Sequence, residues 1–354
     1  MLILRPEEVE GLLTVGETIE AVEKAFAEWG KEPEINLTRR RLHAGAARLN
    51  AMPGALPSRG RIGVRIQCET LTVTEGTQHY PSRSPLVDVV FDSRSAAPLA
   101  VVLSSTKRGA TADGVSLQTS DFMTASISAV GTKWMSRPES ESLTLLGAGK
   151  QARTHLAAMR AIRRLKKVKV FSRSRESRER FAKEMSSVLN LDVNPVENVR
   201  EAMEDADVIL AATNTNVPVF PGEWLRPGVH VTSIVGSNVG MVKAGVIQQK
   251  RRELDDTTFI RADRIGIASR AQAIQDEQGD VFDQVQAGLI SWDKIFDLGQ
   301  IVTGQASGRS APTEITVFKN NGGQGIAELA IADLILSKAR EKRLGMEVKW
   351  EEVY

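Results

Sequence analysis

A glycine-rich loop between an apolar strand and a helix constrains the fold of this chain more than any other stretch. The apolar run 143–146 leads into Gly147, Gly149 and Ala152, and residues 150–162 have the apolar spacing of a helix. Dinucleotide-binding folds carry this pattern, in which alanine is allowed at the third position. Gly147 permits the tight turn, Gly149 lets the backbone approach a pyrophosphate, and the helix start offers free N–H groups to its charge. The loop predicts a dinucleotide site, with a ligand-free tight turn as the alternative.

Strands and helices alternate through the segment that follows this loop. Alternation at this spacing implies right-handed crossovers and a parallel sheet covered on both faces. We therefore predict an α/β fold with a Rossmann-type doubly wound parallel sheet. The expected strands are 168–172, 207–213 and 229–236, and the expected further helices are 175–189 and about 199–204.

The remainder of the 354 residues has a different texture, which favours a second domain. Residues 14–30 have the periodicity of an amphipathic helix, and 35–103 contain short strand-like segments separated by Gly, Pro and Ser. A loop is expected over 104–114. Further helices are expected at 121–136 and 326–343, the last packing on the first domain or on a partner subunit.

Composition limits the possible classes of protein. Charged residues make up 25%, hydrophobic ones 42%, and the net charge of +2 gives no sign of a nucleic-acid or membrane partner. Cys68 is the single cysteine, which excludes a disulfide framework and a multi-cysteine zinc site, and we expect it to be buried. The four histidines are too scattered for a metal site. Residues 1–20 do not resemble a secretory signal and no apolar stretch is long enough for a membrane span, so a cytoplasmic location is expected.

The end of the second expected strand favours NADP over NAD as the cofactor. NAD-binding domains carry an acidic residue here for the ribose 2′-hydroxyl, whereas this chain has Ser172 followed by Arg173 and Arg175. A small hydroxyl beside a guanidinium suits a 2′-phosphate. The alternative is that these arginines are merely solvated, as we expect for Arg178 and Arg180 and for the basic run 163–167.

The whole chain resembles the ornithine cyclodeaminase/mu-crystallin family, which also includes archaeal-type alanine dehydrogenases and ketimine reductases. The resemblance implies NAD(P)-linked chemistry at the α-carbon of an amino acid, through an imine, in a homodimer. It also implies a substrate-binding and dimerisation domain of α+β type over 1–122, completed by 315–354, and a Rossmann domain over 123–314. The segments that carry it are 39–54, 63–66, 124–136, 145–152, 207–220, 298–309 and 314–323.

The resemblance also assigns candidate site residues. Arg39 is expected to bind the substrate carboxylate, Arg65 replaces a family lysine, and Asn50 stands where the family has an acidic residue. An expected carboxylate-binding arginine is replaced by Met123, and Lys107 or Arg108 in the preceding loop could substitute for it. The candidate cofactor-contacting residues, beyond those named above, are Gln151, Thr124, Thr213 and Asn320.

The family's acidic residue in a glycine turn falls on Asn238, which we take as the candidate catalytic position. Cyclodeamination needs an acid/base group near the α-carbon, and an amide cannot take a proton at neutral pH. Reducing an imine needs mainly a carboxylate clamp and a placed hydride, and Asn238 can still hydrogen-bond the nitrogen. We therefore expect an NADP-dependent reductase of an α-imino acid. A cyclodeaminase and a non-catalytic NADP-dependent binding protein remain alternatives, and His43 and Tyr80 are further candidates for lining the site.

Overall fold

The chain divides into two compact units. The computed structural model describes residues 1–74, 77–79, 81–105, 109–112, 116–117, 121–243, 245 and 247–349, so Tyr80, Lys107 and Arg108 lie outside the described residues. Unit 1 comprises 1–74, 78–123 and 323–354, and unit 2 comprises 75–77 and 124–322. The second boundary falls later than the expected position after residue 314, because the short strand β18 (Thr316–Lys319) belongs to the sheet of unit 2.

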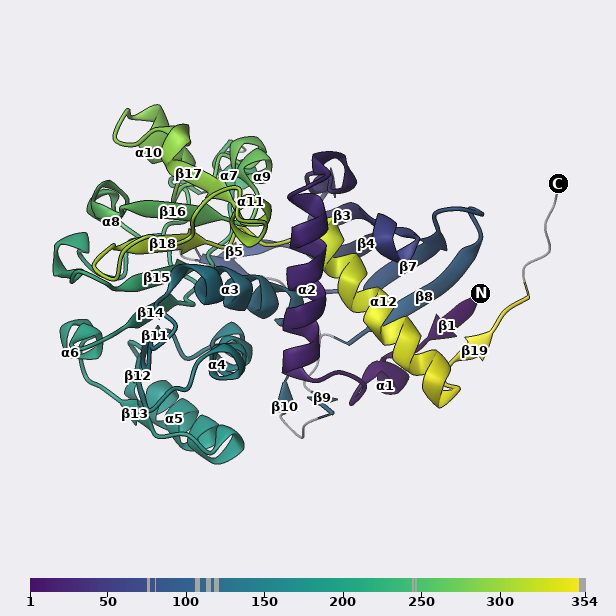
Figure 1. The fold of residues 1–354 in the computed structure, drawn as a ribbon, viewed down its shortest axis with the longest axis horizontal. Coiled ribbons are helices and arrows are strands. Elements are labelled where there is room, and N and C mark those ends of the chain that lie inside the picture. Colours follow the sequence, from purple (N-terminus) through teal and green to yellow (C-terminus); the bar gives the residue numbers. More distant parts are fainter. Residues whose placement is uncertain are drawn as a thin grey trace. The chain divides into compact units, whose positions relative to one another are not determined.

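A seven-stranded sheet forms the body of unit 1 (Figure 1). Its strand order is β19-β1-β8-β7-β4-β3-β2, in which β1 and β8 run parallel and the other neighbours run antiparallel. The strands are β1 (Leu2–Leu4), β2 (Arg40–Ala44), β3 (Ala47–Leu56), β4 (Arg61–Thr70), β7 (Leu86–Asp92), β8 (Pro98–Ser104) and β19 (Met346–Glu347). Short pairs are formed by β5 (Thr72–Thr74) with β6 (Thr77–His79), and by β9 (Gly109–Ala110) with β10 (Ser116–Leu117).

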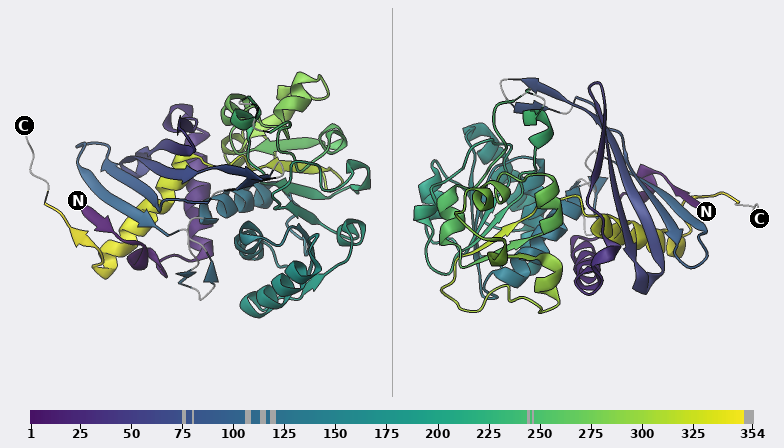
Figure 2. Two further views of the ribbon diagram at one scale, coloured as in Figure 1. Left: turned by 180° about the vertical axis from the view of Figure 1, so that it is seen from behind. Right: turned by 90° about the horizontal axis from the view of Figure 1, so that it is seen from above.

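Two long helices lie on one side of this sheet. Helix α12 (Gly325–Lys342) packs on the sheet and α2 (Val15–Trp29) packs on α12, as Figures 1 and 2 show; the short helix α1 (Pro6–Val9) precedes them. A Cβ on Gly54 or Gly325 would overlap the backbone of the other segment, so this contact requires glycine. Asn36 Oδ1 accepts from the backbone N–H of Ile326 at 3.2 Å. These contacts fix the first turn of α12 over β3.

The opposite face of the sheet is apolar. Its exposed members include Leu42 at 67%, Ile62 at 48% and Leu49 at 37% exposure. Antiparallel sheets usually present polar side chains to water, so this face differs from an ordinary solvated surface. Cys68 is exposed on the same face, which corrects the expectation that it is buried. Half-buried apolar side chains continue the face across β4, β7 and β8: Val64, Ile66, Val87, Val89, Phe91, Val101 and Leu103.

Unit 2 has the predicted doubly wound parallel sheet. Its order is β13-β12-β11-β14-β15-β18-β16-β17, and every neighbouring pair is parallel. The chain passes from β11 outward through β12 to β13 and then returns to β14 on the other side, so the strand order reverses between β11 and β14. Ligands of such sheets bind outside the carboxyl ends of the strands at this reversal. The strands are β11 (Ser142–Leu146), β12 (Lys167–Phe171), β13 (Val193–Pro195), β14 (Val208–Ala211), β15 (His230–Ser233), β16 (Arg264–Ile267) and β17 (Ile295–Asp297), with β18.

Helices connect these strands. Serine, aspartate and asparagine side chains cap the starts of several of them, as Ser174 does for α5 by accepting from the N–H of Ser177. The helices are α3 (Phe122–Met135), α4 (Lys150–Ile162), α5 (Arg175–Leu189), α6 (Val199–Met203), α7 (Val239–Lys243), α8 (Asp256–Arg261), α9 (Arg270–Gln275), α10 (Phe282–Gln286) and α11 (Leu298–Val302). No helix within the described ranges combines the length and hydropathy that a membrane span requires.

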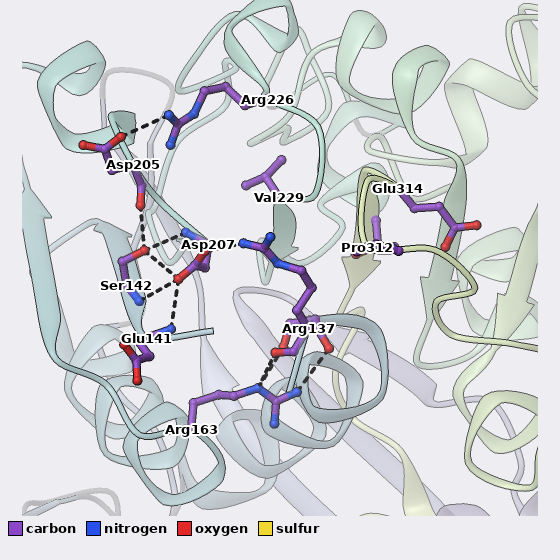
Figure 3. Close-up of polar contacts among 12 residues, drawn as sticks. Arg137, Glu141, Ser142, Arg163, Asp205, Asp207, Arg226, Val229, Pro312 and Glu314 are labelled. Atoms are coloured by element: carbon purple, nitrogen blue, oxygen red, sulfur yellow. Dashed lines mark hydrogen bonds and ion pairs between the residues drawn. The ribbon is translucent and has the colours of Figure 1, made fainter. Parts of the chain in front are cut away.

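A polar network ties the loops at the amino-terminal edge of the parallel sheet (Figure 3). Asp207 accepts from Arg137 at 2.5 Å, from the N–H groups of Glu141 and Ser142, and from the Ser142 hydroxyl. Arg163 is buried and donates to the carbonyls of Lys133 and Arg137 behind the end of α3. Arg163 is therefore an exception to the expected solvated basic run, because it satisfies carbonyl groups that a helix end leaves open. The network lies at the edge opposite to the expected ligand site.

Candidate functional site

The glycine-rich loop leaves room for a ligand at the start of α4. Gly147 has φ +113°, and a Cβ there would overlap the Ala212 carbonyl oxygen at the end of β14, so a side chain cannot be accommodated. A Cβ on Gly149, the N-cap of α4, would meet no atom within 4 Å. Ala152 is fully buried where α4 packs on the sheet. The tight turn, the open space and the thirteen-residue helix behind it fit a pyrophosphate group.

Arg153 supports this loop, a role that the fingerprint does not reveal. Its Nη1 donates to the carbonyls of Ala148 at 3.0 Å and Gly149 at 2.9 Å, while Nε and Nη2 pair with Glu184 on α5. Because the C=O and N–H of a trans peptide point in opposite directions, the N–H groups of Gly149 and Lys150 point away from Arg153. Nothing in the sequence pattern distinguishes Arg153 from a solvated helix residue.

His155 links the same helix to α3. Its Nδ1 lies 2.8 Å from the Gln151 carbonyl and its Nε2 lies 3.0 Å from Ser128 Oγ. Burial lowers the pKa of His155 to about 4, so the ring is neutral at physiological pH. His155 is therefore a structural residue of the loop region.

The arginines after β12 differ in their surroundings. Arg173 is exposed and forms no ion pair with any residue that the structure describes, whereas Arg175 pairs with Glu179 at 2.7 Å. Arg178 is buried and donates to the Ser172 carbonyl at 3.1 Å, which corrects the expectation that it is solvated. Arg178 thus fixes the backbone of Ser172, and Arg173 is left facing solvent.

Three further candidate cofactor residues lie beside one another around the carboxyl end of β18. Asn320 Nδ2 donates to the Thr124 carbonyl at 2.7 Å and to Ser128 Oγ at 2.8 Å, and its Oδ1 accepts from the Gly322 N–H. Through these hydrogen bonds, Asn320 holds the start of α3 against the end of β18. Gln151 is connected to the same place through His155 and Ser128.

Unit 2 contains a buried ionic network at the carboxyl edge of its sheet, which the sequence did not predict. Lys319, Asp280 and Glu253 are fully buried, and Lys319 Nζ donates to Asp280 at 2.6 Å and to Ser233 Oγ at 2.9 Å. Glu253 accepts from the N–H and hydroxyl of Thr213 at 2.6 and 2.7 Å. It also accepts from the N–H groups of residues 234 and 235 at 2.9 Å each. The network fixes the loops that follow β14 and β15, which carry Thr213 and Asn238.

Asn238 lies in the second of these loops and is buried. Its Oδ1 accepts from the backbone N–H of Arg251 at 2.9 Å, and its carbonyl accepts from the N–H of Met241. Because Oδ1 is occupied in this way, the Nδ2 group is the part of the amide that can point a donor at a ligand.

In unit 1, the three candidate substrate-binding residues share one region. The register pairs Met52 with Arg65 and Asn50 with Gln67, so Asn50 and Arg65 point to the face covered by α12. Arg39 precedes β2, and a Cβ on Gly323 would overlap its guanidinium, so the missing side chain of Gly323 leaves the space that Arg39 fills. Met123, in place of the expected arginine, is buried. His43 is exposed on the edge strand β2.

Asn50 stands where an acidic residue was expected, but a carboxylate from another strand lies beside it. Asn50 Nδ2 donates to Glu69 Oε1 at 3.2 Å, and Glu69 also pairs with Arg48 and with Arg83, the latter at 2.9 Å. Glu69 comes from the neighbouring strand β4, which places the acidic group on the same sheet face. No local pattern predicts this exchange, because the two residues are 19 positions apart in the chain.

Arg65 is shared between two buried carboxylates. Its Nε and Nη2 donate to Asp88 on β7 at 2.7 and 2.8 Å, and its Nη1 donates to Glu328 on α12. These bonds use three of the five N–H groups of a guanidinium, so two remain for a further anion. Burial raises the pKa of Asp88, and it raises the pKa of Glu328 to about 7 although Arg65 and Arg39 oppose the shift. Glu328 therefore changes charge near neutral pH.

Among the described residues, no group of three or more His, Cys, Asp or Glu side chains is arranged to hold a metal ion. The site features are a dinucleotide-type loop on a doubly wound sheet in unit 2 and an arginine-containing polar face in unit 1. The loop and the doubly wound sheet define the class of dinucleotide-binding proteins.

The chain belongs to the ornithine cyclodeaminase/mu-crystallin family, whose model matches residues 1–343. It is 26% identical to a Δ1-pyrroline-2-carboxylate reductase of Bacillus cereus over 353 residues, 99% of this chain and 100% of that protein. It is 31% identical to the ketimine reductase mu-crystallin of Rattus norvegicus over 324 residues, 90% of each chain. The structure of the Δ1-pyrroline-2-carboxylate reductase of Thermococcus litoralis, in complex with NADH and L-proline, matches with a TM-score of 0.81 and 27% identity. That match covers 98% of this chain and 100% of the other.

Proposed function

We propose that this protein is an NADP-dependent reductase that converts an α-imino acid to the corresponding amino acid. The observation that carries the proposal is the similarity to Δ1-pyrroline-2-carboxylate reductase along 99% of the chain. Asn238 also disfavours cyclodeamination, because an amide cannot exchange a proton near neutral pH as a carboxylate does. The bound nicotinamide would supply the hydride that adds to the imine carbon.

The residues at the carboxyl edge of unit 2 would hold the cofactor. The loop from Gly147 to Ala152 and the start of α4 would receive the pyrophosphate. Arg173, exposed and without an ion pair in the described chain, would bind a 2′-phosphate next to the Ser172 hydroxyl. Arg175 contributes less, since Glu179 already pairs with it. This difference supports NADP through Arg173 in particular.

The substrate carboxylate would bind to Arg39 and to the two remaining N–H groups of Arg65. Arg65 keeps a fixed orientation because Asp88 holds it by two bonds. Asn50 and its partner Glu69 lie on the same sheet face and would contact the part of the substrate that lies away from the carboxylate. In unit 2, Asn238 would offer its Nδ2 donor to a bound ligand.

The apolar outer face of the unit 1 sheet supports a homodimer. Ile62 and Leu49 are exposed there, and the half-buried Val64, Val89 and Val101 continue the face. A second copy of the same sheet would bury this surface in a symmetric contact. The dimer would place the two outer faces together and leave the faces under α12 for substrate.

The test is cofactor oxidation by purified protein. NADPH is mixed with Δ1-pyrroline-2-carboxylate, its six-membered-ring homologue, or 2-oxo acids with ammonia or methylamine, and loss of the reduced nicotinamide absorbance is followed. We expect turnover with at least one imine, and Arg39→Ala should raise KM for the imine while leaving NADPH affinity unchanged. Tight NADPH binding without turnover on any imine would instead indicate a non-catalytic binding protein.

A further inference from the structure

A buried carboxyl of α12 lies among the groups that would bind the substrate carboxylate. Glu328 is in the first turn of α12, and Arg65 Nη1 donates to its Oε2. The close contact of Gly325 with Gly54 fixes this turn over the sheet, so the backbone of Glu328 is held on the side of the sheet that carries Arg65. The charge of Arg39 also acts on Glu328.

Both signs of charge are present in this region before substrate binds. Asp88 and Glu328 carry two negative charges when ionised, and Arg65 and Arg39 carry two positive ones. A substrate carboxylate at the arginines adds a third anion to a buried group, and an uncompensated buried charge is costly. Adding one proton to one of the carboxylates offsets the negative charge that the substrate brings.

Glu328 is better suited than Asp88 to accept that proton. Asp88 receives two hydrogen bonds from Arg65, at 2.7 and 2.8 Å, whereas Glu328 receives one. The pKa of Glu328 already stands at about 7, mainly because of burial, and a nearby anion that competes for Arg65 raises it further.

The other charged groups on the elements around α12 are engaged elsewhere. Asp333, further along the helix, pairs with Arg59 and Arg61 at 2.9 and 2.7 Å. Glu17 of α2 pairs with Lys338 at the far end of α12 at 2.6 Å. On β3, Arg48 pairs with Glu69, and Arg5 pairs with Glu7 and Glu8 next to α1. Within the described ranges, Arg65, Asp88 and Arg39 are the charged groups that act on Glu328.

We propose that Glu328 takes up one proton when the carboxylate of an α-imino acid binds at Arg39 and Arg65, so that the anionic substrate enters a buried site without a net gain of negative charge. The inference rests on the proposed function. It makes Glu328 a positioning residue that controls the charge of the substrate site. The step is a proton transfer from solvent to one carboxylate oxygen, and no bond of the substrate changes.

The test is proton uptake on binding of pyrrole-2-carboxylate, a planar carboxylate without a reducible C=N bond, to protein saturated with NADP⁺. Calorimetry in buffers of different ionisation enthalpy gives the number of protons taken up. For a group with a pKa of about 7, uptake should rise from about 0.1 proton at pH 6 to about 0.9 at pH 8. The dissociation constant should correspondingly rise up to about tenfold per pH unit above 7.

Glu328→Gln should bind the analogue with no uptake and with a dissociation constant independent of pH, because the amide resembles the protonated acid. Asp333→Asn is the matched control, a buried carboxylate on the same helix that also pairs with arginines, and it should keep the wild-type uptake. Infrared difference spectra of the wild type should show the carbonyl band of a protonated carboxyl when the analogue is added. This measurement needs no variant.

Binding of the analogue by the wild type without proton uptake, or unchanged uptake in Glu328→Gln, would overturn the inference. If imine turnover is present in these preparations, the proposed function stands and the role of Glu328 alone is wrong. If the wild type neither binds the analogue nor turns over any imine, the substrate site itself is wrong and the inference falls with it.

Discussion

Breaking the buried pair of Lys319 and Asp280 should strongly destabilise unit 2. Both side chains are fully buried, Lys319 Nζ lies 2.6 Å from Asp280 Oδ2, and the ammonium group also donates to Ser233 Oγ. Asp280→Asn keeps the shape of the side chain but leaves the Lys319 charge uncompensated. Removing one partner of a buried ion pair costs about 3–5 kcal/mol. For a unit of this size, that corresponds to a fall in Tm of roughly 6–20 °C.

The assay is thermal unfolding followed by circular dichroism, together with urea denaturation, at one protein concentration and without cofactor. The double variant Lys319→Met with Asp280→Asn should recover most of the loss, since it removes both members of the ion pair together. A loss below about 1 kcal/mol in Asp280→Asn would refute the reasoning, as would a double variant that is less stable than the single one.

Three further outcomes follow from the site. Gly147→Val should abolish NADPH binding, because a Cβ there overlaps the Ala212 carbonyl, and retained affinity in a fluorescence titration would contradict this. Arg173→Ala should weaken NADPH binding about tenfold and leave NADH binding unchanged, so an equal loss for both cofactors would exclude a 2′-phosphate contact. Ile62→Arg, on the outer sheet face, should halve the mass measured by light scattering, and an unchanged dimer would place the interface elsewhere.

The doubly wound sheet could be predicted because its signals are local. The glycine loop and the alternation of strands and helices are periodic patterns within short windows, and unit 2 contains the sheet they predict. The expected domain boundary after residue 314 placed the short strand β18 outside unit 2. Its partners β15 and β16 are remote in sequence, and four residues form too short a pattern to indicate them.

Burial was predicted wrongly where side chains serve a neighbour that is remote in sequence. Arg163 and Arg178 read as solvated charges, but each is buried because it donates to backbone carbonyls. Cys68 was expected to be buried as a small apolar residue, whereas it is exposed on the apolar outer face of the unit 1 sheet. Residue type alone does not report such contacts.

The polar partners of the candidate site residues could not be predicted from the sequence either. Glu328 is separated from Arg65 by 263 positions and Glu253 from Thr213 by 40, so no spacing rule connects them. The family resemblance supplied the candidates Arg39, Arg65 and Asn50, and the structure adds the carboxylates that surround them. These carboxylates decide how much charge the site can accept.

Transfer of label from the cofactor tests the central claim most directly. NADPH carrying deuterium on the transferring face of nicotinamide C4 is incubated with the protein and Δ1-pyrroline-2-carboxylate, and the amino acid product is analysed by mass spectrometry and NMR. Hydride transfer to the imine carbon predicts one deuterium at the α-carbon of the product. Product without deuterium at that carbon, under conditions in which the labelled cofactor is oxidised, would contradict an imine reductase.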